Sequence, residues 1–197
     1  EGVLVQDGIA GKLPLEVIGE GAAQRIAIRT PRAQLAETAQ ADDPRLQAAL
    51  QGWPLGTLPP ARMQGGRSWW VVQVADEAQL RALQPDWDAI ATLAESTDSM
   101  GVFAYAFSDG DEGYDLAVRA FVGNGRRFED AASGAANAVL AAWLDLRGVL
   151  PRGREPYEVS QGREVGHDAR LTLRVDADGE VWSGGQVQTV IAGTLDW

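Results

Sequence analysis

The stretch FEDAASGAANAVLAAWL, residues 128–144, decides the fold of this chain. Two acidic residues precede residues 131–136, none of which is larger than serine, and an apolar segment follows. A helix that only fills a core needs bulk at its start, whereas a helix that receives a ligand at its start needs room. The segment therefore predicts a helix with a functional N-terminus.

The apolar residues of this segment recur at the spacing of one helix face. They are Val139, Leu140, Trp143 and Leu144. Gly148 and Pro151, which follow, are typical of a helix end. We therefore expect a central helix at about residues 131–147.

The start of this helix is a candidate anion site. The first N–H groups of a helix have no intrahelical partner, and the helix dipole adds positive potential there. A ligand carboxylate or phosphate can accept hydrogen bonds from them when the side chains are small. Ser133, Gly134 and Ala135 are the candidate substrate-binding residues. Asp130 is the candidate catalytic residue, placed to hold a ligand amine or hydroxyl or to transfer a proton.

The same residues also have a purely structural interpretation. Asp130 or Ser133 can serve only as the helix N-cap, and the alanines can be present because they favour helix. Glu129 is expected to be a solvated neighbour of the site rather than a catalyst. The residues alone leave both interpretations open.

Composition limits the possible partners. The chain has 197 residues and is 45% apolar, enough for a substantial core, and no apolar run approaches the ~20 residues that a membrane helix needs. Lys and Arg number 17 against 28 acids, which gives a net charge of −11. Nucleic acid binding requires a basic face, so we expect a small molecule or another protein as the partner, with no nucleic acid and no membrane.

The residue inventory excludes several kinds of chemistry. Cysteine is absent, which removes disulfides and thiol nucleophiles, and His167 is the single histidine, which removes a multi-histidine metal site. The acidic loop Ser108–Gly113 lacks the spacing of an EF-hand, so no metal site is expected. The cytoplasm is taken as the default location.

The order of predicted elements indicates an α+β fold. Strands are expected in residues 3–7, 12–17, 24–30, 68–74, 101–107, 116–122, 157–161, 171–175, 180–182 and 187–197. Short helices are expected after Asp43 and Asp76 and at residues 85–96, while AQLAET, residues 33–38, is expected to be loop. Trp69 and Trp70 cannot face the same side of a strand, so one is expected at the surface or at a domain interface.

Three motifs together resemble one known family. LAVRAFVGNGRRFEDAASGAANAVLAAWL spans residues 116–144, VSQGREVGHDARLTLRV spans 159–175, and VWSGGQVQTVIAGTL spans 181–195. In this order they resemble the signature segments of the phenazine-biosynthesis PhzF-like isomerases. The resemblance covers essentially the whole chain.

The resemblance implies a diaminopimelate-epimerase-like fold, a curled mixed sheet around a central helix. Residues 1–30 would be a strand remnant of a first domain and residues 31–197 a complete second domain. Gly162 joins the expected substrate-binding residues. The family implies a proton transfer on a small carboxylate-bearing metabolite without a cofactor, and often a homodimer. Its catalytic glutamate would lie upstream of Glu1, in a segment or chain missing here.

This sequence departs from the family pattern at several positions. Ala135 replaces the last serine of the helix-start motif, and His167 and Ala169 replace an arginine and a serine. Glu37 echoes the glutamate motif at the wrong place in the chain, and we expect His167 at the surface rather than at the edge of the site. The alternative functions are therefore a non-catalytic relative that binds a small anion or a protein, and an interaction protein that uses its seven tryptophans.

Overall fold

The computed structural model describes residues 4–8, 11–40, 42–150, 152 and 155–194. The strands are β1 (Leu4–Gly8), β2 (Gly11–Ile18), β3 (Arg25–Thr30), β4 (Gln34–Thr38), β5 (Ala61–Gly65), β6 (Arg67–Gln73), β7 (Gly101–Phe107), β8 (Leu116–Val122), β9 (Phe128–Asp130), β10 (Tyr157–Gln161), β11 (Ala169–Val175) and β12 (Val181–Gln186). The helices are α1 (Pro44–Gln47), α2 (Glu77–Ala82), α3 (Trp87–Thr97) and α4 (Gly134–Leu146), with the 3-10 turns η1 (Gly21–Ala23) and η2 (Arg163–Val165).

Within the described residues, the twelve strands form one sheet that does not close. Its order is β1-β2-β3-β12-β11-β10-β8-β7-β6-β5-β4, with β9 paired to β8 outside this path. The pairs β6–β7 and β8–β10 are parallel, and the other pairs are antiparallel. This mixed sheet with few helices confirms the expected α+β class.

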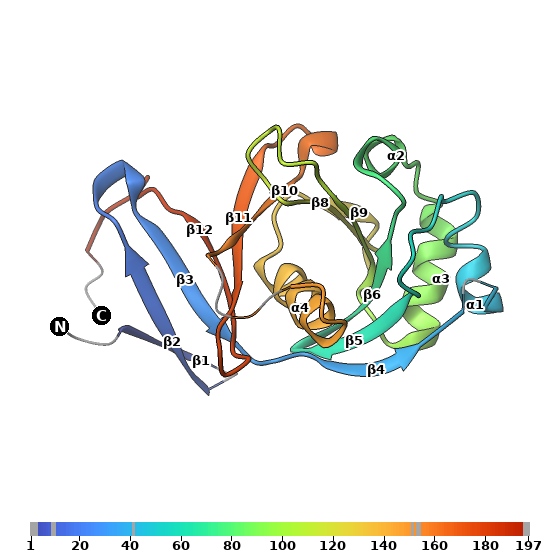
Figure 1. The fold of residues 1–197 in the computed structure, drawn as a ribbon, viewed down its shortest axis with the longest axis horizontal. Coiled ribbons are helices and arrows are strands. Elements are labelled where there is room, and N and C mark those ends of the chain that lie inside the picture. The colour runs from blue at the N-terminus through green and yellow to red at the C-terminus, as the bar shows by residue number, and fades with distance from the viewer. Residues whose placement is uncertain (1–3, 9–10, 41, 151, 153–154, 195–197) are drawn as a thin grey trace.

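The sheet curls around α4, as Figure 1 shows. Every residue from Ala136 to Leu144 is buried, because a helix that is apolar on all sides needs cover on all sides. The helix begins three residues later than expected because Ser133 is its N-cap, and Gly148 follows its end with a φ of 68°. Pro151 lies outside the described residues. None of the described helices is long and apolar enough to cross a membrane.

Strand β6 shows that the central sheet is covered on both faces. Trp69 packs in the core around α4, and Trp70 packs on the opposite face with α1, α2 and α3. The indole Nε1 of Trp70 donates a hydrogen bond to Thr97 Oγ1 at 3.0 Å. Neither tryptophan is exposed, because helices cover both sides of the strand, so that alternative is wrong. The other alternative, a domain interface, stays a prediction.

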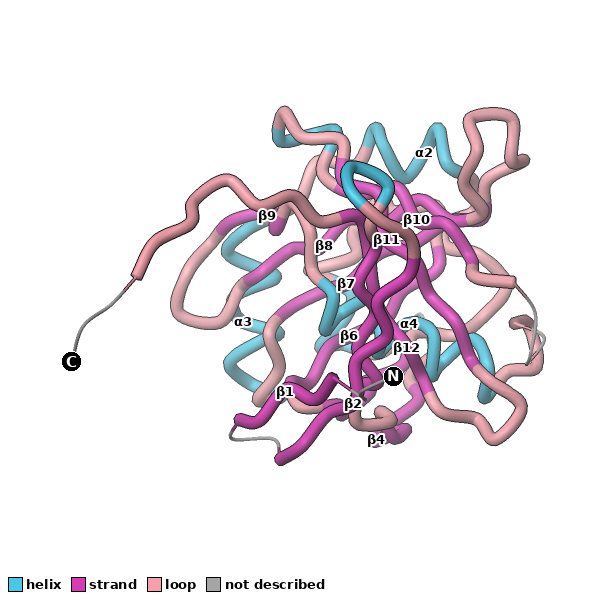
Figure 2. Tube along the Cα trace, turned by 90° about the vertical axis from the view of Figure 1, so that its left-hand side faces the viewer, coloured by secondary structure: helices cyan, strands magenta, loops and turns pink. Residues whose placement is uncertain are grey.

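Two other expectations about strands are also wrong. Residues 34–38 form β4, not loop, because β5 pairs with them. Residues 187–194 contain no strand, and Val190 and Ile191 are exposed. The pairing of β12 with β3 ends at Gln186 and Arg25, and the last bond beside it runs from Val187 N–H to Gln24 O at 3.2 Å. Beyond this point β3 offers no partner for a further strand. This tail extends away from the body in Figure 2. Residues 195–197 lie outside the described part of the chain.

Strands β1, β2 and β3 continue the sheet beyond the curl around α4 (Figure 1). Strands β1 and β2 pair as expected, although their connecting residues 9–10 are not described, and the predicted hairpin at Asp178–Gly179 joins β11 to β12. Ile28 is paired with Ser183, so the two side chains share the sheet face that looks toward α4. A boundary between domains at residue 30 stays a prediction.

The connection between β3 and β4 is tied to the far end of α4. Asp145, whose side chain is only 3% exposed, accepts hydrogen bonds from Arg152 Nε at 2.8 Å and Nη2 at 3.0 Å. Arg32 also binds the Asp145 carboxylate and donates to the carbonyl of Gly179. The Arg152 bonds, with help from Arg32 and against the effect of burial, lower the pKa of Asp145 below its usual value.

We expect Asp145→Asn to lower the free energy of unfolding by about 1–3 kcal/mol near neutral pH, because a charge-assisted pair is lost. A lowered pKa means that Asp145 stabilises the fold above its unfolded pKa of about 3.9, and that this stability is lost as pH falls through the folded pKa. Urea unfolding of both chains should therefore show a difference that shrinks below about pH 4. A difference that stays constant with pH would contradict this account.

Candidate functional site

The start of α4 leaves two backbone donors free. Ser133 Oγ accepts a hydrogen bond from Ala136 N–H at 3.4 Å, and Asn137 N–H donates to Ser133 O at 3.0 Å. Within the described structure, the N–H groups of Gly134 and Ala135 have no hydrogen-bond partner, and both residues are exposed. These are the donors that an anion can use.

A cavity of about 850 Å³ opens beside this helix start. Gly134 and Ala135 line it, together with Ala138 and Val139 one turn further along α4. Strands β2 and β3 contribute the lining residues Leu13, Ile26, Ile28 and Thr30. The helix start is therefore not plugged by packed side chains, and the two free donors face a mostly apolar space.

The other sequence-predicted residues lie beside this cavity rather than in its wall. Asp130, Ser133 and Gly162 are not among its described lining residues. Asp130 Oδ1 accepts a hydrogen bond at 3.3 Å from the N–H of Ala132, which does line the cavity. The structure thus brings the predicted residues together, with two of them forming the wall and three of them shaping the loop before it.

Gly162 shapes this loop through a close backbone approach. Its φ is 87°, a left-handed conformation that side chains rarely adopt. A Cβ placed on it would lie 2.4 Å from the carbonyl oxygen of Ala131. Gly162 therefore holds the preceding loop against the end of β10, and nothing in its position shows contact with a ligand.

Gln161 and Ser183 also belong to this site, although the sequence patterns considered above did not point to them. Gln161 is fully buried, and its side chain bonds to Asp130, Ser133 and Asn137. Ser183 Oγ donates a hydrogen bond to the carbonyl of Gly134 at 3.1 Å. The Gln161-Gly162 pair within the second motif was the one signal in the sequence that could have pointed to Gln161.

Arg170 is one of the lining residues of the cavity, but its guanidinium packs on the other face of the sheet. Leu171 packs in the core around α4, so the neighbouring Arg170 projects from the opposite face of β11. The guanidinium of Arg170 lies 4.5 Å from the centre of the Tyr114 ring on that face. The Arg170 guanidinium therefore packs against Tyr114, while the start of α4 contributes the positive potential of its helix dipole to the cavity.

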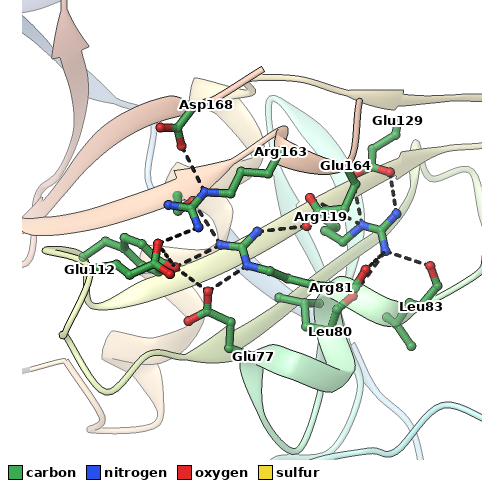
Figure 3. A network of polar contacts seen from close by, with 12 residues as sticks. Glu77, Leu80, Arg81, Leu83, Glu112, Arg119, Glu129, Arg163, Glu164 and Asp168 are labelled. Atoms are coloured by element: carbon green, nitrogen blue, oxygen red, sulfur yellow. Dashed lines mark hydrogen bonds and ion pairs between the residues drawn. The ribbon is translucent and has the colours of Figure 1, made fainter. Parts of the chain in front are cut away.

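Glu129 is buried, which corrects the expectation that it is solvated. Its side chain is 4% exposed and that of Arg119 is 5% exposed, and two hydrogen bonds of 3.0 and 2.7 Å join them. Arg119 Nη1 also donates to the carbonyls of Leu80, Arg81 and Leu83 at the end of α2 (Figure 3). This pair fixes β9, the strand that leads into the site, against α2.

A second arginine extends the same polar network. Arg81 binds Glu77 at 2.7 Å and Glu164 at 2.9 Å, and its Nη2 donates to Ser160 Oγ at 3.1 Å (Figure 3). Burial would raise the pKa of Glu77, but hydrogen bonds from Tyr114 and Arg81 outweigh it and lower that pKa. Glu77, Glu164 and Glu129 are therefore each paired with an arginine.

Two residues that the sequence left in question, His167 and Glu37, are not part of the described cavity wall. His167 is exposed, as expected for a surface residue, and its N–H donates to Gly162 O at 2.9 Å. Glu37 lies in β4 and pairs with Arg45 and with Arg62, the latter at 3.3 Å. Neither residue is among the described lining residues.

We expect Glu129→Ala to lower the free energy of unfolding by about 3–5 kcal/mol, because it leaves the buried Arg119 without its main counter-charge. The control is Asp88→Ala, which removes the exposed pair with Arg127. The Asp88 side chain is 80% exposed, so this change should cost at most about 1 kcal/mol. Urea unfolding measures both variants. Equal, small losses would show that the buried pair contributes little.

A curled mixed sheet around a central helix, with the helix start open to a cavity, defines the diaminopimelate-epimerase-like class of fold. The family model for phenazine biosynthesis-like proteins matches residues 1–194. This chain therefore belongs to the phenazine biosynthesis-like (PhzC-PhzF) family.

Solved structures and a curated protein support this placement. A phenazine biosynthesis protein of the PhzF family from Bacillus anthracis superposes with a TM-score of 0.73 at 18% identity, over 93% of this chain and 65% of its own. A protein from Pseudomonas aeruginosa described as a predicted epimerase gives 0.71 at 26% identity, over 100% and 67%. A curated protein from Schizosaccharomyces pombe, Antisense-enhancing sequence 1, is 24% identical over 96% of this chain and 66% of its length. The chain thus spans about two thirds of the length of these relatives.

Proposed function

We propose that this protein is a PhzF-like isomerase or epimerase that moves a proton on a small carboxylate-bearing metabolite and needs no cofactor. The free N–H groups of Gly134 and Ala135 in the wall of an apolar cavity are the observation that carries this proposal. They would bind the substrate carboxylate, while apolar residues of β2 and β3 would contact its body. Family membership and the likeness to a predicted epimerase support the reaction class.

In this proposal, Asp130 acts at the mouth of the cavity. Its carboxylate accepts a hydrogen bond from the N–H of Ala132. This places it next to the anion-binding turn, Ser133–Ala135, where it can hold a substrate amine or hydroxyl. The glutamate that moves the proton would belong to a segment outside these 197 residues. A homodimer, which the family resemblance implies, stays a prediction that sedimentation can test.

A second candidate function is that of a non-catalytic relative that binds a small anion or a protein. Ala135 stands where the family motif has a serine, so one side-chain hydroxyl is missing from the helix start. The curated relative is named for antisense enhancement rather than for an isomerase activity. The two candidates share the anion site and differ in whether a proton moves.

We expect a simple aromatic carboxylate, benzoate, to bind this site and to shift the amide NMR signals of Gly134 and Ala135. Gly134→Val should weaken this binding at least about tenfold, which is about 1.4 kcal/mol, because its methyl groups would crowd the two donors. Gly134→Ala is the matched control, since its Cβ would make only ordinary contact with Ser183 Oγ at 3.5 Å. Binding that valine leaves unchanged would place the ligand elsewhere.

Deuterium uptake from D₂O into small cyclic unsaturated carboxylates tests the proposed catalysis. We expect these 197 residues alone to be nearly inert, because one positioned acid–base group is worth about 10²–10⁴ in rate. A protein that includes these residues and has the full length of the relatives should exchange substrate protons with solvent. Asp130→Ala in that longer protein should slow the exchange. Asp88→Ala is the control, because that carboxylate is 80% exposed on α3 and is not among the described lining residues of the cavity. A rate of deuterium exchange that Asp130→Ala leaves unchanged would count against a catalytic role for Asp130.

A further inference from the structure

A buried side-chain amide organises the loop that precedes the anion-binding turn. Gln161 Oε1 accepts hydrogen bonds from Ser133 N–H at 3.2 Å and from Asn137 Nδ2 at 2.8 Å. Gln161 Nε2 donates to the carbonyl of Asp130 at 2.7 Å. One side chain at the end of β10 therefore connects both ends of the loop from Asp130 to Ser133 with the first turn of α4.

The amide of Gln161 affects which backbone donors at the helix start remain free. Gln161 takes the N–H of Ser133, and Ser133 takes those of Ala136 and Asn137. The N–H groups of Gly134 and Ala135 remain, two adjacent donors for the two oxygens of one carboxylate. Resting on the proposed function, we infer that Gln161 is the positioning residue that gives the anion site this two-donor geometry.

The role requires an amide in particular. The side chain accepts two hydrogen bonds and donates one, and an ionised carboxylate of the same shape can accept but cannot donate. An ionised carboxylate at position 161 would face the carbonyl oxygen of Asp130, and it would add negative charge beside a site proposed to bind an anion. The neighbouring Gly162 packs against the Ala131 carbonyl, so the backbone there has little room to move away.

Gln161→Glu is therefore the informative variant. Its carboxyl is buried, which raises its pKa above the usual glutamate value, so its ionised fraction is larger at about pH 8 than at about pH 5.5. A neutral carboxyl can donate to the Asp130 carbonyl as the native amide does. The charged or titratable groups on the surrounding elements are Asp130 and Glu129 on β9, Arg119 on β8, Arg163 and Glu164 on η2, Arg170 and Arg174 on β11 and Asp145 on α4, with His167 and Asp168 just before β11. The wild type measured alongside accounts for their effects.

The experiment measures benzoate affinity from the amide shifts of Gly134 and Ala135 in the 197-residue chain. At about pH 8, Gln161→Glu should bind at least about tenfold more weakly than wild type, and at about pH 5.5 within about threefold of it. The matched control is Gln73→Glu, because Gln73 Oε1 likewise accepts a backbone N–H, that of Leu58 at 2.8 Å, and the residue is not in the cavity wall. The benzoate affinity of Gln73→Glu should equal that of the wild-type chain at both pH values.

Each outcome distinguishes the two levels of the proposal. If wild type binds benzoate at Gly134 and Ala135 and Gln161→Glu binds equally well at both pH values, Gln161 has no positioning role while the anion site stands. An equal loss at both pH values would assign Gln161 a purely structural role. A wild type that shows no benzoate shifts at these amides would overturn the proposed function, and the role of Gln161 with it.

Discussion

The burial of α4 on every side is the constraint on which the rest of the structure depends. A helix that carries apolar residues around its whole circumference needs a sheet that wraps it, and the curl from β4 to β12 meets that need. Wrapping covers the sides of the helix but not its first backbone donors. The open N-terminus, with Gly134 and Ala135 at the cavity, is a direct consequence of this packing.

The helix start is held by strands that are distant from it in sequence. Gln161 at the end of β10 and Ser183 in β12 each bond to the first turn or to the loop before it. Because these partners belong to one continuous sheet, the donors are preorganised before any ligand arrives. In an apolar cavity, such donors interact more strongly with an anion than they would in water.

The net charge of −11 raises the question of how an acidic protein would bind an anion. Asp130 accepts a hydrogen bond from the N–H of Ala132, and two other acids near the site are paired with arginines, Glu129 with Arg119 and Asp168 with Arg163. Pairing removes much of their local field, while the helix start contributes its own positive potential. The local arrangement of charge therefore decides the potential at the site, and the total does not.

The sequence alone determined the central helix, its ending at Gly148, most strands and the exposed turn of small residues, because spacing and residue size are local properties. It could not show β4, the burial of Trp70 or the Arg119–Glu129 pair, since each depends on a partner from a distant part of the chain. The tertiary structure decided that Gly134 and Ala135 line a cavity and that Gln161 holds the loop before them. Hydrogen bonds between elements far apart in sequence leave no periodic pattern, so only the folded sheet could show them.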